Sequence, residues 1–152
     1  MKPIIFQRAK ISDLSAIVEL LTQDDLGKSR ESLDKNNLSA YEKAFAKISS
    51  DKNQYLMIGK IDDEIVTTCH LTIMPSLTFK GTTRLQIEAV RVKMSFRGQK
   101  IGEKMMSEIK NFARQNDCAI IQLTTNKSRV DAKRFYEKQG FVASHEGMKF
   151  DL

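Results

Sequence analysis

Apolar residues recur at intervals of three and four positions in four stretches of the chain, which is the spacing of one helix face. Ser12 or Asp13 can cap the first stretch, and the capping-box pattern Ser39-Ala-Tyr-Glu42 opens the second. The fourth starts after Ser128 and ends at Gly140, a residue type suited to a left-handed helix end. The apolar faces of the four predicted helices are Leu14, Ile17, Val18 and Leu21; Tyr41, Phe45 and Ile48; Ile101, Met105, Ile109 and Phe112; and Ala132, Phe135 and Tyr136.

Runs of β-branched and apolar residues lie between these helices and predict strands. Asp62 and Asp63 separate two such runs and mark a tight hairpin. The run at 118–125 follows a strand and a helix, so it should end a βαβ crossover and lie parallel to the strand at 84–92. The other predicted strands are residues 4–8, 54–61, 64–74, 141–142 and 147–150.

The resulting order is β-α-α-β-β-β-α-β-α-β-β, without an internal repeat or linker. It predicts a single α/β (α+β) domain over residues 1–152, with a mixed, largely antiparallel central sheet and flanking helices. Polar loops are expected at 23–37 and 75–83. Gly27-Lys28-Ser29 matches the end of a P-loop, but Thr22 stands where that motif needs glycine and a helix precedes it, so a P-loop is rejected.

Composition narrows the classes of function only slightly. Of the 152 residues, 41% are hydrophobic and 29% charged, which is ordinary for a soluble globular protein. Without an apolar run of roughly 20 residues or a signal-peptide pattern, we expect a cytoplasmic protein with no membrane partner. Cys69 and Cys118 lie far apart in apolar runs and are interpreted as reduced core thiols, and His70 and His145 are isolated, so no metal site is expected.

The net charge of +6 suits an anionic partner such as nucleic acid or a polyphosphate cofactor. No nucleic-acid partner is expected, because the chain lacks clustered aromatic residues and a recognition motif. In residues 86–102, a strand passes through the turn Arg97–Gly102 directly into a helix. The first turn of a helix offers unpaired N–H groups and the positive end of the helix dipole, and Arg97 and Lys100 add full charges. The stretch therefore predicts an anion-binding helix start.

Two motifs resemble the GNAT superfamily of acetyl-CoA-dependent N-acetyltransferases, and the resemblance covers essentially the whole chain. The family signature Gln/Arg-x-x-Gly-x-Gly/Ala reads here Arg97-Gly98-Gln99-Lys100-Ile101-Gly102, with Lys100 in place of the first glycine. The second motif, Ala132-Lys-Arg-Phe-Tyr-Glu-Lys-Gln-Gly-Phe141, is similar to the family's Ala-x-x-Phe/Leu-Tyr-Glu-Lys-x-Gly-Phe. Together they imply an acyltransferase with acetyl-CoA (coenzyme A) as co-substrate.

The resemblance implies where coenzyme A would bind. Its pyrophosphate would be held by the turn Arg97–Gly102, and its peptide-like pantetheine arm would pair with the edge of the fourth strand. The family often has an asparagine seven residues before its tyrosine; that position is Arg129 here, so Arg129 or Asn126 would contact the cofactor. The implied cofactor-binding residues are Val90, Arg91, Val92, Arg97, Gly98, Gln99, Lys100, Ile101, Gly102, Asn126 and Arg129.

Glu88 is the catalytic base that the resemblance implies. It would take a proton from the acceptor ammonium, directly or through water, and an apolar strand around it should raise its pKa. Strand alternation places Glu88 on the same face as Val90. The alternatives are a solvent-facing Glu88, a Glu88 paired with Arg84 or Arg91, or His70 as the base.

Tyr136 would donate a proton or a hydrogen bond to the leaving thiolate, with a purely packing role as the alternative. Direct attack of the amine on the thioester in a ternary complex is expected, because neither motif contains a cysteine. The loops at 23–37 and 75–83 would form the acceptor site. The short chain leaves little room for a peptide groove, which favours the primary amine of a small molecule over a protein or peptide.

Two other functions stay open. One is a GNAT-like module that binds acyl-CoA as a sensor without catalysis, against which the presence of both Glu88 and Tyr136 argues. The other is an N-acetyltransferase that acts on a protein or peptide. The resemblance also allows a homodimer, although no particular residue argues for one.

Overall fold

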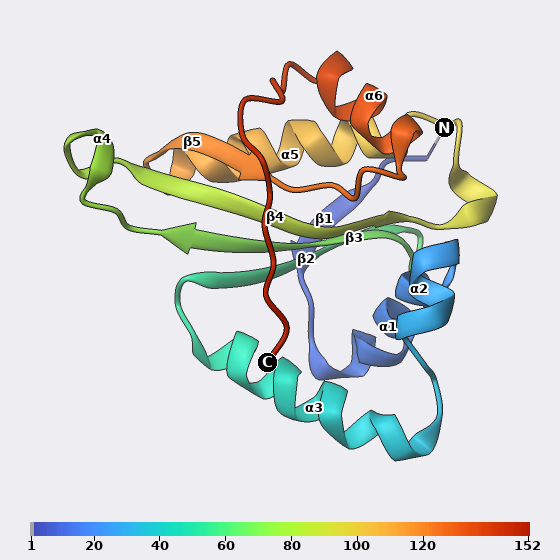
Figure 1. Cartoon of the computed structure of the whole chain (residues 1–152). Helices are drawn as coiled ribbons and strands as arrows, with labels where there is room; N and C mark the ends of the chain where they lie inside the picture. The colour runs from blue at the N-terminus through green and yellow to red at the C-terminus, as the bar shows by residue number, and fades with distance from the viewer. Residues whose placement is uncertain (1) are drawn as a thin grey trace.

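The computed structural model describes residues 2–152, which form a five-stranded sheet with helices on both faces (Figure 1). The strand order is β1-β2-β3-β4-β5, and β4 pairs with β5 in parallel while the other pairs are antiparallel. The predicted fold class is confirmed, including the hairpin at Asp62 and Asp63 and the crossover from β4 to β5. The strands are β1 Ile5–Arg8, β2 Gln54–Ile61, β3 Glu64–Met74, β4 Thr83–Val92 and β5 Cys118–Leu123.

The helices divide between the two sides of the sheet. Figure 1 shows α5 and α6 on one side and α1, α2 and α3 on the other. Across residues 2–152, no helix combines the length and the apolar character needed to cross a bilayer. The helical elements are η1 Ile11–Asp13, α1 Leu14–Thr22, α2 Asp25–Arg30, α3 Lys35–Ser50, α4 Thr78–Gly81, η2 Met94–Phe96, α5 Ile101–Gln115 and α6 Val130–Lys138.

Each face of the sheet has its own apolar cluster. On one face, Met105 and Ile109 of α5 pack without solvent exposure against the sheet, where Leu85 of β4 is also fully buried. On the other face, Ile17 of α1 and Phe45 of α3 belong to a second buried cluster. Burial of both faces explains why β2 and β3 are apolar on both sides of the strand.

The region 23–37, predicted as a polar loop, contains α2 and the first residues of α3. Asp24 precedes α2, and its Oδ1 accepts a hydrogen bond from the Gly27 N–H at 2.5 Å. Asp34 caps α3 in the same manner. The predicted helix start at Ser39 is therefore wrong, because the aspartate cap begins the helix earlier in the chain.

The closing strands predicted at 141–142 and 147–150 are also wrong, since residues 139–152 contain no strand. Met148, Phe150 and Leu152 alternate as in a strand, but they are 93%, 88% and 117% exposed. Alternation expresses a preference for extended backbone, whereas a strand also needs a neighbour that pairs with its N–H and C=O groups. None of the five strands pairs with this segment.

Candidate active site

β4 loses its parallel neighbour half-way along its length. Its pairing with β5 ends at Ile87 and Leu123, where β5 itself ends. The β4 residues from Glu88 to Val92 therefore have no strand on that side. Such an edge presents N–H and C=O groups with which an extended ligand can pair. The predicted pantetheine edge thus coincides with the unpaired half of β4.

A β-bulge marks the point where β4 becomes unpaired. Opposite β3, Glu88 faces His70 and Arg91 faces Thr68, so two β4 residues stand against the single residue Cys69. Ala89, one of these two, has a left-handed backbone with a φ of 51°, which a residue with a Cβ adopts only at some cost. The bulge bends β4 and interrupts its alternation.

This interruption corrects the predicted faces of the strand. Leu85 and Ile87 point to the α5 side, so Glu88 points to the α1 and α3 side, as Gln86 does. Val90, in contrast, packs against the α5-side cluster. The prediction that Glu88 and Val90 share a face is wrong, because the extra residue at the bulge turns Val90 over.

Glu88 lies opposite His70 and is exposed to solvent, so the apolar surroundings expected for its carboxylate are not found. His70 is half-buried, and this burial lowers its pKa, with a smaller opposing effect from Glu88. The His70 Nε2 lies 2.6 Å from the Gln54 Oε1. Because that amide oxygen can only accept, Nε2 carries the hydrogen and Nδ1 is left as an acceptor.

The carbonyl groups at the predicted pantetheine edge accept hydrogen bonds from side chains. The Val90 carbonyl accepts from Arg91 Nη1 at 2.9 Å, and the Val92 carbonyl accepts from Arg97 Nε at 3.3 Å. The Arg91 carbonyl accepts from the Thr67 hydroxyl at 2.7 Å. A peptide-like ligand at this edge would have to displace the arginine side chains, which come from neighbouring residues.

The turn Arg97–Gly102 leads into α5 through two left-handed residues, Gly98 with φ of 75° and Lys100 with φ of 61°. Lys100 is the N-cap of α5, and its carbonyl accepts the N–H of Lys104 at 3.1 Å. The left-handed backbone gives a conformational reason for glycine at this signature position, because glycine adopts it without strain. Residues 97–100 are exposed, so the start of α5 is accessible to an anion.

Gly102 holds the start of α5 close to α6. A Cβ at this position would lie 3.1 Å from the Phe135 ring, so even alanine would require that ring to shift by a few tenths of an ångström. The second signature glycine therefore has a packing role as well as its predicted place in the turn.

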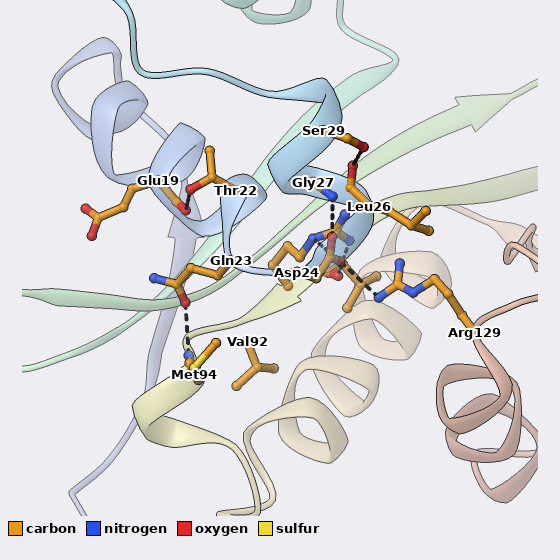
Figure 2. Close-up of polar contacts among 12 residues, drawn as sticks. Glu19, Thr22, Gln23, Asp24, Leu26, Gly27, Ser29, Val92, Met94 and Arg129 are labelled. Carbon is orange, nitrogen blue, oxygen red and sulfur yellow. Dashed lines mark hydrogen bonds and ion pairs between the residues drawn. The ribbon is translucent and has the colours of Figure 1, made fainter.

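A buried ion cluster joins three distant parts of the chain (Figure 2). The Asp24 Oδ2 lies 3.2 Å from Arg91 Nε and 3.3 Å from Arg129 Nη2. The Arg91 side chain is only 7% exposed. Its Nε is not aligned as a hydrogen-bond donor to Asp24, so the contact is chiefly electrostatic. Burial lowers the pKa of Arg91, and the Asp24 charge opposes that effect; a guanidinium nevertheless stays charged.

The sequence prediction missed Asp24, which it placed in a featureless loop. Its position directly before a helix is a capping signal that could have drawn attention to it. Figure 2 also shows the Gln23 side chain accepting a hydrogen bond from the Met94 N–H, at 3.0 Å. Together these contacts fix the junction of α1 and α2 against the end of β4.

The two candidates for an additional cofactor contact, Arg129 and Asn126, both have partners within the chain. Arg129 pairs with Asp24. The Asn126 Oδ1 accepts from the Ser128 N–H at 2.9 Å and from the Ser128 hydroxyl at 2.7 Å. The role of each toward a cofactor stays a prediction.

Tyr136 lies in α6 between two aromatic rings. Its ring centroid is 5.4 Å from that of Phe135 and 5.9 Å from that of Phe141. Burial raises the pKa of its hydroxyl, with a smaller opposing effect from Arg129 and Arg91. The phenol therefore stays protonated at neutral pH and can act as a donor, while its ring has the packing role considered as the alternative.

The loop at 75–83, predicted to border the acceptor site, contains α4 and joins the other ends of β3 and β4. Glu88 lies five residues beyond Thr83 along β4, or roughly 17 Å at the rise of a strand. Figure 1 shows α4 at the end of the sheet away from α2 and α6. This loop does not reach the bulge.

Comparison with known proteins gives consistent matches. The family model described as Acetyltransferase (GNAT) family matches residues 15–141. Aminoalkylphosphonate N-acetyltransferase of Salmonella typhimurium is 31% identical over 113 residues, which is 73% of each chain. Glucosamine 6-phosphate N-acetyltransferase of Trypanosoma brucei brucei is 32% identical over 88 residues, or 58% of each chain. A solved structure described as a transcriptional regulator from Bacillus halodurans C-125 has 40% identity and a TM-score of 0.94, over 99% of this chain and 100% of the other.

Proposed function

This chain belongs to the GNAT acetyltransferase family and is an acetyl-CoA-dependent acyltransferase, and from this premise we propose that it acetylates the primary amine of a small molecule. The matched residues, 15–141, contain every residue to which the sequence assigns a role. The observation that carries the proposal is the bulged, unpaired half of β4. It has a carboxylate on one face, a backbone edge without a neighbouring strand and an accessible helix start beyond it.

Glu88 is the proposed base. An acceptor amine must lose a proton before it can attack a thioester, and Glu88 is exposed on the α1 and α3 side of the sheet. His70 lies directly across from it, and its lowered pKa keeps the imidazole neutral at pH 7. A neutral imidazole next to the carboxylate can accept a hydrogen bond from the same ammonium without repelling it.

Tyr136 is the proposed donor to the leaving thiolate. Acetyl-CoA, when bound, supplies the acetyl thioester. Transfer of the acetyl group leaves coenzyme A as a thiolate, and a phenol can neutralise that negative charge by donating its proton. The Asp24 cluster places Arg91 and Arg129 close enough to Tyr136 to affect the pKa of its hydroxyl. These two cations would favour the same developing charge.

Direct attack of the amine is the proposed route, without a covalent acyl-enzyme. Cys69 is fully buried, and burial raises the pKa of its thiol well above the ordinary range. Burial also raises the pKa of Cys118, which lies at the end of the β4–β5 pairing away from Leu123 and Glu88. A thiol that stays protonated is a poor nucleophile.

The turn Arg97–Gly102 is the proposed pyrophosphate site. The charge reversal Lys100→Asp is expected to weaken coenzyme A binding about tenfold, because aspartate tolerates the left-handed backbone but repels phosphate. Lys100→Gly should weaken it only by roughly threefold, the effect of losing one exposed charge. Isothermal titration calorimetry with coenzyme A measures both. Lys43→Asp, an exposed position in α3, is the matched control for net charge; equal affinities for Lys100→Asp and Lys43→Asp would remove the turn from the site.

A small-molecule acceptor is preferred to a peptide. The two named relatives act, according to their names, on an aminoalkylphosphonate and on glucosamine 6-phosphate, and both of these acceptors are small amines. Acetylation of a protein or peptide amine remains the alternative within the same reaction class.

A second candidate function is a sensor that binds acyl-CoA without turnover. The observation that favours it is the similarity to the Bacillus halodurans protein described as a transcriptional regulator. The presence of both Glu88 and Tyr136 favours the enzyme.

Glu88→Gln tests the base directly. Release of free thiol from acetyl-CoA, followed across a panel of amines, should fall about a hundredfold, the usual loss when a general base is removed. Glu103→Gln, an exposed carboxylate in the first turn of α5, is the matched control and should retain its activity towards amines. Coenzyme A binding without thiol release on any amine, for the unmodified protein, would favour the sensor.

A further inference from the structure

An apolar cavity of about 130 Å³ lies between α1, α3 and the sheet. Its walls include Leu14 and Val18 from α1, Ala44 and Phe45 from α3, and Leu56 from β2. The cavity is open to solvent on one side, where Ala44 is exposed. It is therefore a hollow that a solute can enter and that the core has not filled.

The inner end of this cavity reaches the bulge of β4. Three of its lining residues, Thr68, His70 and Ala89, surround the position where β4 leaves its regular pairing with β3. Ala89 directly follows Glu88, and His70 lies opposite Glu88. A molecule in the cavity would thus present one end to the proposed base.

The chemistry of the walls selects the kind of molecule. Among the described residues that line the cavity, none carries a charge. The Tyr41 hydroxyl already donates to the Glu31 Oε2 at 2.7 Å, and the Thr68 hydroxyl donates to the Met57 carbonyl at 3.0 Å. The His70 ring, at the inner end, keeps Nδ1 as an acceptor for a ligand. Burial of a phosphate or phosphonate here would leave its charge without a partner.

We infer that the apolar cavity binds the hydrocarbon part of the acceptor, so that the acceptor is an amine on an alkyl or aromatic body about the size of a benzene ring. A cavity of roughly 150 Å³ with apolar walls accommodates benzene. The inference rests on the proposed function, since it names the acceptor of that same reaction. It separates this chain from its two named relatives, whose acceptors carry a phosphonate or a phosphate.

A second hollow, on the α1 side of the chain, does not suit an acceptor of this kind. It has a volume of about 310 Å³ and is lined by charged residues of both signs, among them Asp13, Lys60, Glu64 and Lys93. Lys60 pairs with Asp13 at 2.9 Å, and Lys93 pairs with Glu64. Neither His70 nor Ala89 lines it, so it does not open onto the bulge.

The test is acetyl transfer to a graded set of amines. Propylamine, butylamine, pentylamine and phenethylamine are compared with 2-aminoethylphosphonate and glucosamine 6-phosphate. The value of kcat/KM should rise about fourfold for each added methylene, the effect of burying one CH₂. Phenethylamine should exceed both phosphorylated acceptors by more than about tenfold.

A pair of variants in α3 tests the location. Ala44→Leu narrows the cavity from its open side and should raise KM for phenethylamine about tenfold. Ala46→Leu is the matched control, because Ala46 is exposed two residues further along α3 and does not line the cavity. Leucine is a good helix former, so both variants should fold.

The outcomes separate the inference from the proposed function. Faster transfer to a phosphorylated acceptor, or equal KM values for the two variants, overturns the inference and leaves the acetyltransferase in place. If no amine is acetylated while coenzyme A binds, the proposed function fails. Calorimetry with phenethylamine alone then tests whether the cavity binds an apolar amine. Saturable binding that Ala44→Leu removes supports the inference, and absence of binding overturns it.

Discussion

Replacing Asp24 by alanine is expected to lower the free energy of unfolding by about 4 kcal/mol, of which about 3 comes from the buried ion cluster and about 1 from the lost helix cap. The change leaves the Arg91 guanidinium, which is 7% exposed, without its counter-ion. The loss of about 3 kcal/mol assigned to the ion cluster is at the lower end of the range for breaking a buried ion pair. The reason is that Arg129 is 34% exposed, so water can solvate its charge. Urea denaturation followed by circular dichroism measures the loss.

Two further variants separate the cluster from the cap. Asp34→Ala removes only the exposed cap of α3 and should cost about 1 kcal/mol. Asp24→Asn keeps a side-chain oxygen for the Gly27 N–H but removes the negative charge. It should therefore lose most of the stabilisation from the ion cluster and keep that from the helix cap. If Asp24→Ala costs no more than Asp34→Ala, the ion cluster does not stabilise the fold.

Tyr136→Phe is expected to lower kcat about a hundredfold, the effect of losing a general acid, and to leave coenzyme A affinity almost unchanged. Phenylalanine keeps the ring that packs between Phe135 and Phe141, so the change is confined to the hydroxyl. Because burial raises the pKa of Tyr136, the donor form should persist from pH 7 to about pH 10. Within that window, kcat should show no decline caused by this group.

The matched control is Tyr55→Phe. The Tyr55 ring packs on the same apolar cluster, 4.7 Å from the Phe112 ring, but it belongs to β2 and lies outside the proposed site. Steady-state kinetics and coenzyme A titration for both variants give the comparison. Equal kcat values for the two would leave Tyr136 with a packing role only.

The fold was predictable because its signals are local. The helices α1, α3, α5 and α6 each have an apolar face at helical spacing, and each strand run is bounded by polar residues or by Gly and Pro. The short helices α2 and α4 lie in regions predicted as loops. The same holds for the turn at Arg97–Gly102, whose sequence leads directly from strand to helix. Local patterns fail where pairing depends on distant residues, as in the strands expected at 141–142 and 147–150.

The site was predictable only in part, for a similar reason. The position of Glu88 on the α1 and α3 side follows from alternation, but the reversal at Val90 depends on the bulge at Ala89, and alanine is no signal for a left-handed backbone. The cluster of Asp24, Arg91 and Arg129 joins residues far apart in the chain. No spacing within the sequence could have revealed that contact.

The bulge sets the side-chain alternation of β4, and thereby places Glu88 and Val90 on opposite faces of the sheet. If Ala89 continued the regular strand in place of the bulge, strict alternation would turn Val90 towards the face of Glu88 and direct Arg91 into the apolar cluster beneath α5. A guanidinium there would lie away from Asp24, which caps α2 on the opposite side of the sheet from α5 (Figure 1). The backbone conformation of one small residue, Ala89, therefore decides whether Arg91 can reach its counter-ion.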